Sequence, residues 1–178
     1  THVDRWQRSW RIGVWPLLAG WTAMDDALLH SLGDEAIGVK SAHWYSADFD
    51  SESNKRFVAD MQKNYNVLPG GYSAGMYIAG MCIEAALEKS GGKAASKKAF
   101  AEELHKVSIK DSPRGPFHFD QYGNVVGTVF IRNCERKNGK LVNTVIKTYP
   151  NVSQFWTYDS KKFLSQPVYS RDYPPLKG

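Results

Sequence analysis

The stretch Tyr72–Lys89, YSAGMYIAGMCIEAALEK, decides how the rest of the chain must fold. Its apolar residues cover a wide helical face, and the small residues between them let another backbone approach closely. Pro69-Gly70-Gly71 precedes the stretch and Gly91-Gly92 follows it, so a helix is predicted to begin and end there. A helix with so wide an apolar face needs layers on both sides, which favours an α/β sandwich over a helical bundle.

The size and composition of the chain fit one domain. Its 178 residues are enough for a core of its own. The formal net charge of +5 makes the chain mildly basic. Its lysines form short pairs rather than a stripe, so nucleic acid is not an expected partner. No apolar run approaches the ~20 residues of a membrane span, and no stretch has the pattern of a signal peptide.

The two cysteines, Cys82 and Cys134, show neither metal-ligand spacing nor a dense disulfide pattern. One falls in the central helix and the other in a predicted strand. We therefore expect two separate buried thiols, with a disulfide between them as the alternative. The sequence contains no zinc-binding spacing, phosphate-binding loop or dinucleotide fingerprint, so we expect no metal and no cofactor.

The first half of the chain alternates short apolar strands with helices. Residues 14–19 (VWPLLA) and 37–45 (IGVKSAHWY) are predicted strands. Between them, Thr22 and Asp25 have the spacing of a capping box, which predicts a helix from Thr22 to Gly33. Two further helices are expected, one carrying Phe57, Met61 and Tyr65 and one capped by Ser96. This order predicts an α/β fold with a doubly wound, mostly parallel sheet flanked by helices.

The second half changes character at Pro113. Strands are predicted at residues 117–119, 125–134 and 141–149. The turn signals between them predict antiparallel pairing, and Lys137-Asn138-Gly139-Lys140 is the strongest of these signals. A C-terminal antiparallel hairpin therefore follows the α/β layer, and His118 is expected to face solvent.

The two ends of the chain carry many aromatic residues. Residues 3–12 (VDRWQRSWRI) are predicted to form a short amphipathic helix that docks on the domain. A membrane-binding segment is the alternative. Residues 150–178 are rich in proline and aromatic residues, and we expect them to form an extended arm.

Several segments, in order along the chain, resemble one protein family. Residues 16–45 resemble a strand, loop, helix and strand of its C-terminal lobe, and residues 54–72 (NKRFVADMQKNYNVLPGGY) resemble the helix that follows. Tyr72–Lys89 resembles its next helix, and residues 114–124 (RGPFHFDQYGN) resemble its hairpin. The family is that of the type I periplasmic solute-binding proteins of ABC transporters, which bind branched-chain amino acids and related ligands such as aromatic carboxylates.

The resemblance implies the substrate-binding component of an ABC importer, or a fragment of it, located in the periplasm. Full-length members have two lobes. Residues 1–149 would then form one ligand-binding lobe, with the first lobe absent, and residues 150–178 its arm. An amino acid or small aromatic carboxylate would bind between the lobes, whose closure signals to the transporter permease. We expect weak or no binding by this chain alone.

A different class of function is the main alternative. The surface left open by the missing lobe would favour a homodimer, so the chain could act as an assembly module without ligand binding of its own.

Candidate ligand-binding residues lie where the predicted strands end. Ligands of open α/β sheets bind beyond the carboxyl ends of the strands, and a helix N-terminus there suits a carboxylate. The resemblance places the loop after residues 14–19 in the cleft. We expect five residues to line it: Trp21, Thr22, His43, Trp44 and Tyr72. The competing interpretation is that each aromatic residue closes the top of the core.

An enzyme is not expected. Residues 71–75 (GYSAG) have the spacing of a serine hydrolase elbow, but they follow a turn rather than a strand. A serine hydrolase is therefore the least favoured alternative. The adjacent acids Asp25 and Asp26 are expected to act as helix caps and partners of the helix dipole.

Overall fold

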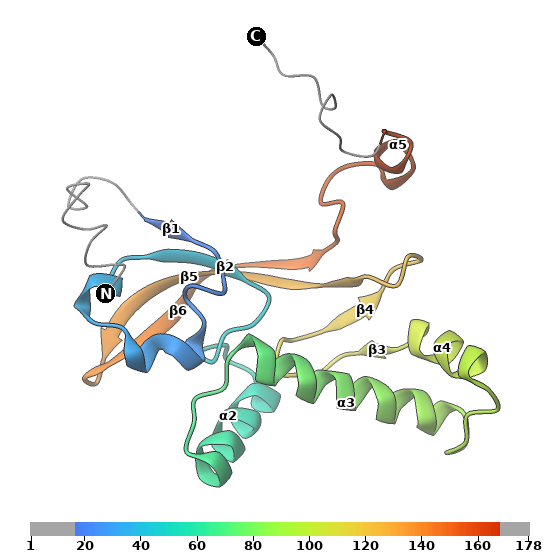
Figure 1. Ribbon diagram of the computed structural model, residues 1–178, viewed down its shortest axis with the longest axis horizontal. Coiled ribbons are helices and arrows are strands. Elements are labelled where there is room, and N and C mark those ends of the chain that lie inside the picture. Colours follow the sequence, from blue (N-terminus) through green and yellow to red (C-terminus); the bar gives the residue numbers. More distant parts are fainter. Residues whose placement is uncertain (1–16, 168–178) are drawn as a thin grey trace.

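An open sheet with helices along one side forms the framework of the molecule (Figure 1). The computed structural model describes residues 17–167. The strands follow the order β1-β2-β5-β4-β3, and β6 pairs with β5. Their bounds are β1 Leu18–Ala19, β2 Lys40–His43, β3 Ser108–Ile109, β4 Phe117–Phe119, β5 Val125–Lys137 and β6 Lys140–Val152. The predicted α/β class, with helices flanking an open sheet, is confirmed.

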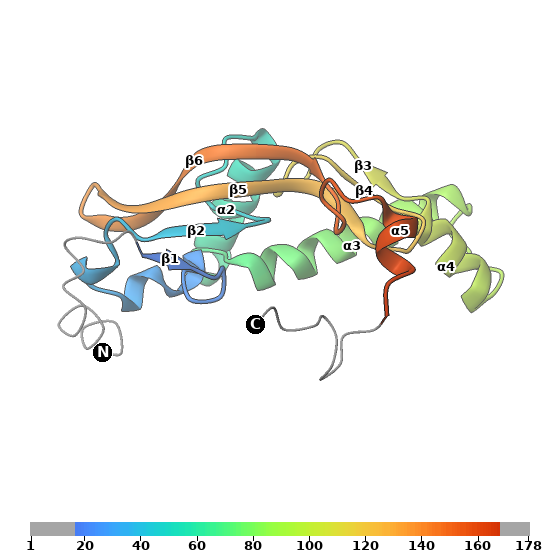
Figure 2. The same ribbon diagram turned by 90° about the horizontal axis from the view of Figure 1, so that it is seen from above.

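Within residues 17–167 the sheet is mixed. Parallel pairing joins β1 to β2, with Leu18 opposite Lys40 and Ala19 opposite Ser41. The other neighbouring strands pair in antiparallel fashion. Most of these pairings come from the long β5–β6 hairpin, which curves across the molecule in Figure 2.

Turn chemistry explains the two predicted hairpin connections. Asn138 and Gly139 both have positive φ, 50° and 77°, as a two-residue turn between strands of normal twist requires. The predicted turn at Lys137–Lys140 is therefore confirmed. At the β4–β5 turn, the Asp120 carboxylate accepts from the N–H groups of Tyr122 and Asn124. His118 in β4 is exposed, as predicted.

The helices begin mostly where capping residues predict. Their bounds are η1 Asp26–Ser31 and η2 Asp34–Ala36 (both 3₁₀), α2 Glu52–Tyr65, α3 Gly71–Lys89, α4 Lys97–His105 and α5 Ser160–Leu164. Ser96 caps α4, as predicted, by accepting from the Ala99 N–H. The predicted helix start at Thr22 is wrong. Thr22 lies in a turn closed by a bond from the Ala23 N–H to the Gly20 carbonyl, and Asp25 is the residue that caps η1.

Helix α3 has the predicted extent, but the expectation that it is covered on both sides is wrong. Its inner face packs toward α4 and β4 through Ile78, Cys82 and neighbouring small residues. Its outer face leaves Tyr72 71% and Met76 76% exposed. Figures 1 and 2 show the sheet, α2 and α4 along other sides of α3. At the N-terminal end of the exposed face, the Tyr72 ring lies 5.0 Å from that of Trp21.

Two main hydrophobic clusters stabilise the fold. One lies between α3, α4 and β4, and the other lies beneath η1. The first contains Ile78, Cys82, Ala86, Val107 and Phe117. The second contains Met24, Leu29, Ala36, Val39, Cys134 and Leu141. The two cysteines are free and buried in different clusters, so the prediction of two separate thiols is confirmed.

The C-terminal segment leaves the sheet after β6. It contains a short helix, α5, because the Asp159 carboxylate accepts from the Lys162 N–H and caps it. Figure 1 shows α5 standing away from the sheet. Residues 3–12, predicted to form a docking helix, lie outside the described residues, and the predicted arm, residues 150–178, is described only as far as residue 167.

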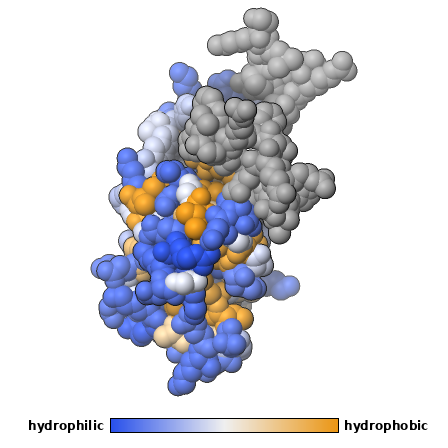
Figure 3. Space-filling model, turned by 90° about the vertical axis from the view of Figure 1, so that its left-hand side faces the viewer, coloured by the Kyte–Doolittle hydropathy of each residue, from blue (hydrophilic) through white to orange (hydrophobic). Residues whose placement is uncertain are grey.

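None of the helices within residues 17–167 is long and apolar enough to cross a membrane. The side of the molecule shown in Figure 3 is mainly hydrophilic, with hydrophobic residues in separate patches.

Candidate functional site

Four of the five candidate residues meet at the N-terminal end of α3. The Trp21 ring centroid lies 4.8 Å from that of His43 and 5.0 Å from that of Tyr72. Trp44 stacks on His43 at 5.3 Å with an interplanar angle of 25°. Thr22 is exposed in the turn next to Trp21. We call the four rings of Trp21, His43, Trp44 and Tyr72 the aromatic cluster.

The topology explains why residues far apart in sequence meet here. Trp21 follows β1, and His43 is the last residue of β2. Because β1 and β2 are parallel, their carboxyl ends open at the same edge of the sheet. Helix α3 begins beside that edge, which places Tyr72 against Trp21.

Asp25 joins the turn after β1 to the start of α3. One of its carboxylate oxygens accepts from the Ala27 N–H at 3.0 Å, and the other accepts from the Gly71 N–H at 2.8 Å. The expectation that Asp25 acts as a helix cap is therefore confirmed, and it serves two helices. No helix begins at Thr22, so the free N–H groups of a helix N-terminus that were expected there are not available to a ligand. At the start of α3, the first N–H, that of Gly71, already donates to the Asp25 carboxylate.

Glycine is required at the start of α3. A Cβ at Gly70 would lie 1.7 Å from an Asp25 carboxylate oxygen, and one at Gly71 would lie 2.6 Å from Cε1 of His43. At such distances a side chain at either position would displace the buried Asp25 carboxylate or the buried His43 ring. The Pro-Gly-Gly turn therefore allows the carboxylate and the imidazole to approach the helix backbone closely.

His43 presents a neutral ring with one unused donor. Its Nδ1 accepts from the Tyr45 N–H at 2.7 Å, so Nε2 carries the proton. Burial, with a contribution from Arg132, lowers the pKa of His43 to about 4. Nε2 is buried and has no hydrogen-bond partner within residues 17–167. His43 can therefore donate one hydrogen bond to an oxygen brought into the cluster.

A buried ion pair fixes the segment that carries the cluster. Arg132 in β5 donates to the Asp26 carboxylate at 2.7 Å and to the carbonyls of Met24 and Tyr45. Asn143 in β6 donates to the Met24 carbonyl at 2.8 Å and to Asp26. Burial raises the pKa of Asp26 to about 6. These bonds tie the turn after β1 to both strands of the long hairpin.

The expectation that Asp26 caps a helix is wrong: Asp26 is buried and forms an ion pair with Arg132, a partner that the sequence analysis did not identify. A signal was present in β5, where alternate residues face the core. Phe130, Arg132 and Cys134 share that buried face. A single arginine on an otherwise apolar strand face predicts a buried anion opposite, although the sequence does not say which one.

Ser73 has a structural role. Its hydroxyl accepts from the Gly70 N–H and donates to the Gly70 carbonyl, both at 3.0 Å. These bonds close the first turn of α3, and the context of a strand-to-helix elbow is absent at Ser73. Within the described residues, no three His, Cys, Asp or Glu side chains are grouped so that they could hold a metal ion.

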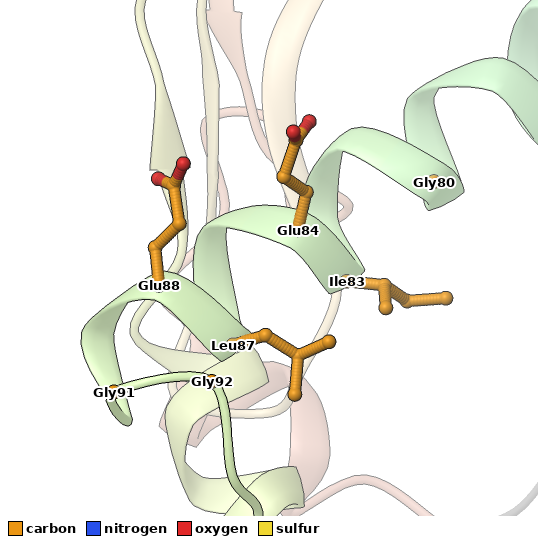
Figure 4. Close-up of a pocket in the computed structure, with 7 residues that line it drawn as sticks. All are labelled: Gly80, Ile83, Glu84, Leu87, Glu88, Gly91 and Gly92. Atoms are coloured by element: carbon orange, nitrogen blue, oxygen red, sulfur yellow. The ribbon is translucent and has the colours of Figure 1, made fainter.

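An open groove lies at the opposite end of α3, and the sequence did not indicate it. It has a volume of about 670 Å³. Figure 4 shows Ile83 and Leu87 pointing to one side of the helix, with the carboxylates of Glu84 and Glu88 pointing to another. The remaining lining residues are Gly80, Gly91 and Gly92. The groove has no buried polar group and continues the apolar outer face of α3.

Comparisons with known proteins agree with this architecture. The profile of a family described as periplasmic binding protein matches residues 13–140. A protein named Leu/Ile/Val-binding protein homolog 6, from Brucella abortus, is 30% identical over 125 residues, which are 68% of this chain and 32% of that protein.

Two solved structures of ABC transporter solute-binding proteins from Rhodopseudomonas palustris are also similar. One, from strain BisB5, is in complex with 3,4-dihydroxybenzoic acid. It is 35% identical with a TM-score of 0.72, covering 76% of this chain and 37% of its own. The other, in complex with benzoate, is 28% identical with a TM-score of 0.63, covering 73% of this chain and 35% of its own.

The chain spans about a third of the length of these relatives. The family match nevertheless extends over most of its residues. The chain therefore belongs to the family of type I periplasmic binding proteins, whose members are non-enzymatic, extracytoplasmic solute-binding proteins of ABC transporters.

Proposed function

We propose that this chain is part of the substrate-binding component of an ABC importer and that the aromatic cluster lines its ligand cleft. The observation that carries the proposal is the unpartnered Nε2–H of His43, held within a cluster of aromatic rings at the edge of the sheet. A buried donor without an acceptor is costly unless a ligand or water supplies one.

A small aromatic carboxylate is the ligand class that the cluster fits best. Trp21 and Tyr72 offer ring faces and edges against which an aromatic ring packs well. The Nε2–H of His43 offers a donor to a carboxylate or phenol oxygen. The two Rhodopseudomonas palustris relatives hold 3,4-dihydroxybenzoic acid and benzoate. An amino acid remains the second ligand class, because the Brucella abortus relative is named for leucine, isoleucine and valine.

We propose that a first lobe completes the cleft and covers the outer face of α3. This face is apolar and exposed, and the matched relatives are about three times as long as the matching region. Closure of two lobes around the ligand would then signal to a transporter permease in the periplasm. One lobe alone supplies only part of the contacts, so we expect this chain to bind with a dissociation constant above ~1 μM.

Thermal-shift measurements and calorimetric titration test the proposal. The ligands are 3,4-dihydroxybenzoate, benzoate and leucine, each at millimolar concentration. We expect a small stabilisation by the aromatic acids, lost in Trp21→Ala and kept in the control Trp156→Ala, which removes an exposed Trp beyond β6. Equal shifts in both variants, or binding tighter than ~1 μM, would contradict the proposal.

The exposed face of α3 also favours a second candidate, an assembly module that forms a homodimer. Its apolar residues Met76 and Ile83, together with the adjoining groove, are the kind of surface that buries itself against a second copy. Light scattering at high protein concentration decides this question. A dimer abolished by Met76→Asp supports the module, and a monomer at every concentration excludes it.

A further inference from the structure

Arg114 is a buried cation that the proposed cleft does not use. It lies in the loop between β3 and β4 and is only 9% exposed. One guanidinium nitrogen, Nη2, donates to the Thr128 carbonyl at 3.3 Å, while Nε has no partner within residues 17–167. Burial lowers the pKa of Arg114 to about 10, so the side chain stays charged at neutral pH. No carboxylate among the described residues forms an ion pair with it.

The surrounding backbone provides space for this side chain. The Ser112 hydroxyl donates to the Gly115 carbonyl at 2.6 Å and accepts from the Arg114 N–H, which closes the loop. On the facing strand β5, a Cβ at Gly127 would lie 3.0 Å from Nη2 of Arg114 and 3.1 Å from Cβ of Phe117. A side chain at this position would therefore push the guanidinium aside by a few tenths of an ångström.

The guanidinium faces two aromatic rings. Its central carbon lies 4.9 Å from the ring centroid of Trp44 and 5.7 Å from that of Phe117. Trp44 in turn stacks on His43, so a column of Arg114, Trp44 and His43 extends from the β3–β4 loop to the aromatic cluster. A buried cation against the face of Trp is a favourable contact with a defined geometry.

We propose that Arg114 is a positioning residue that holds the Trp44 ring against His43 and thereby sets the shape of the aromatic cluster. This inference rests on the proposed function in one respect, namely that the aromatic cluster lines the ligand cleft. Arg114 itself does not touch the cleft residues Trp21 and Tyr72. Its effect reaches them through Trp44 and His43.

The same column gives Arg114 an electrostatic effect on His43. The charged groups that act on His43 are Arg132 and Arg114, which disfavour a second proton, and Asp25, which favours one. The phenol of Tyr45 is neutral, because burial raises its pKa. Removing the charge of Arg114 should therefore make His43 easier to protonate. A residue that only stabilised the fold would not move this property.

The test is an NMR comparison of the ligand-free chain with Arg114→Lys and Arg114→Met. Two signals are followed: the indole resonance of Trp44 and the pH titration of the His43 ring. We expect both variants to shift the Trp44 resonance, because neither has a planar guanidinium. We expect Arg114→Met to raise the pKa of His43, and Arg114→Lys, which keeps the charge, to change it less. Arg56→Met, at an exposed surface arginine, should leave both signals unchanged.

A folded Arg114→Lys or Arg114→Met protein with an unshifted Trp44 resonance would overturn the proposal. If both substitutions prevent folding, Gly127→Ala provides the second test, because its methyl group crowds Nη2 of Arg114 and leaves the charge in place. It should shift Trp44, and an unshifted resonance there overturns the proposal equally. No ligand is used in these measurements, so their failure is separate from a failure of benzoate to bind, which bears on the proposed function alone.

Discussion

The N-terminal end of α3 and the outer face of the same helix differ in their contacts. Polar groups at the N-terminal end are hydrogen-bonded, whereas apolar side chains on the outer face are exposed. At the N-terminal end, the Asp25 carboxylate accepts a hydrogen bond from the Gly71 N–H, and the Ser73 hydroxyl accepts one from the Gly70 N–H. The His43 ring packs against the backbone of Gly71. On the outer face, Met76 is 76% exposed and Ile83 is 46% exposed. In the first region, the buried Nε2–H of His43 has no partner within residues 17–167. The second is exposed within residues 17–167, and the first lobe proposed above would cover it.

The largest expected effect comes from breaking the anchor of the first region. Arg132→Met leaves the Asp26 carboxylate buried without its partner, so we expect a loss of about 3–5 kcal/mol in the free energy of unfolding. Urea denaturation followed by circular dichroism measures it. The matched control is Arg136→Met, whose surface ion pair with Asp34 should contribute at most about 1 kcal/mol. Equal losses in the two variants would contradict the account of this anchor.

Two isoleucines of α3 compare its faces directly. Ile78 is 7% exposed on the inner face, and Ile83 is 46% exposed on the outer face. We expect Ile78→Ala to lower the free energy of unfolding by about 2–5 kcal/mol, because it opens a cavity. Ile83→Ala should change it by about 0.5 kcal/mol or less. A large loss from Ile83→Ala in this chain would mean that the outer face is already covered, for example by a second copy.

A smaller effect is expected from the first turn of α3. Ser73→Ala removes the hydroxyl that bonds to both backbone groups of Gly70, and the expected loss is about 1 kcal/mol in the free energy of unfolding. Thermal unfolding measures it. Hydrolysis of generic esters should be absent from the wild-type chain and from Ser73→Ala alike. Ester hydrolysis that disappears in the variant would revive the hydrolase alternative.

The last effect is a change in the pH dependence of stability at His43, seen as a slope rather than as a loss at one pH. Its pKa is lowered to about 4 in the folded chain, against an ordinary 6.5. Between these values the unfolded chain takes up a proton that the folded chain does not, so stability falls as pH falls. His43→Gln removes this contribution, so we expect the free energy of unfolding to fall less steeply between pH 7 and 4.5 than in the wild type. The two slopes should differ by at most about 1.4 kcal/mol per pH unit.

Asp26 acts in the opposite direction. Its folded pKa, raised to about 6, makes the folded chain keep a proton that the unfolded chain loses, so its contribution rises as pH falls through 6. Because Asp26 is present in both proteins, the difference between wild type and His43→Gln isolates His43. If the free energies of unfolding of the wild type and His43→Gln had the same pH dependence, the fold would not keep His43 neutral.

The sequence predicts much of the cluster, because local rules govern it. Parallel strands place their ends together, so Trp21 and His43 could be expected to meet, and the Pro-Gly-Gly turn identifies the start of α3 beside them. The spacing of Thr22 and Asp25 was misleading. Both residue types cap helices, and tertiary bonds from Asp25 to α3 and from Asp26 to Arg132 decide which of them does so.

The outer face of α3 could not be predicted from the sequence. Apolar periodicity indicates that a face is to be buried, but it does not say whether the covering element belongs to the same chain. Met76 and Ile83 have the pattern of core residues and are exposed in residues 17–167. The Arg114–Trp44 contact was equally hidden, because it joins segments about 70 residues apart, which meet only because β2 and β4 both pair with β5.

Ligand binding at the aromatic cluster is best tested by an NMR titration of the isotopically labelled chain with 3,4-dihydroxybenzoate. We expect the resonances of Trp21, His43 and Tyr72 to shift together, with a dissociation constant above ~1 μM, while those of the groove at Gly80–Gly92 stay in place. Shifts confined to the groove, no shift at the cluster at tens of millimolar ligand, or binding tighter than ~1 μM would each contradict this expectation.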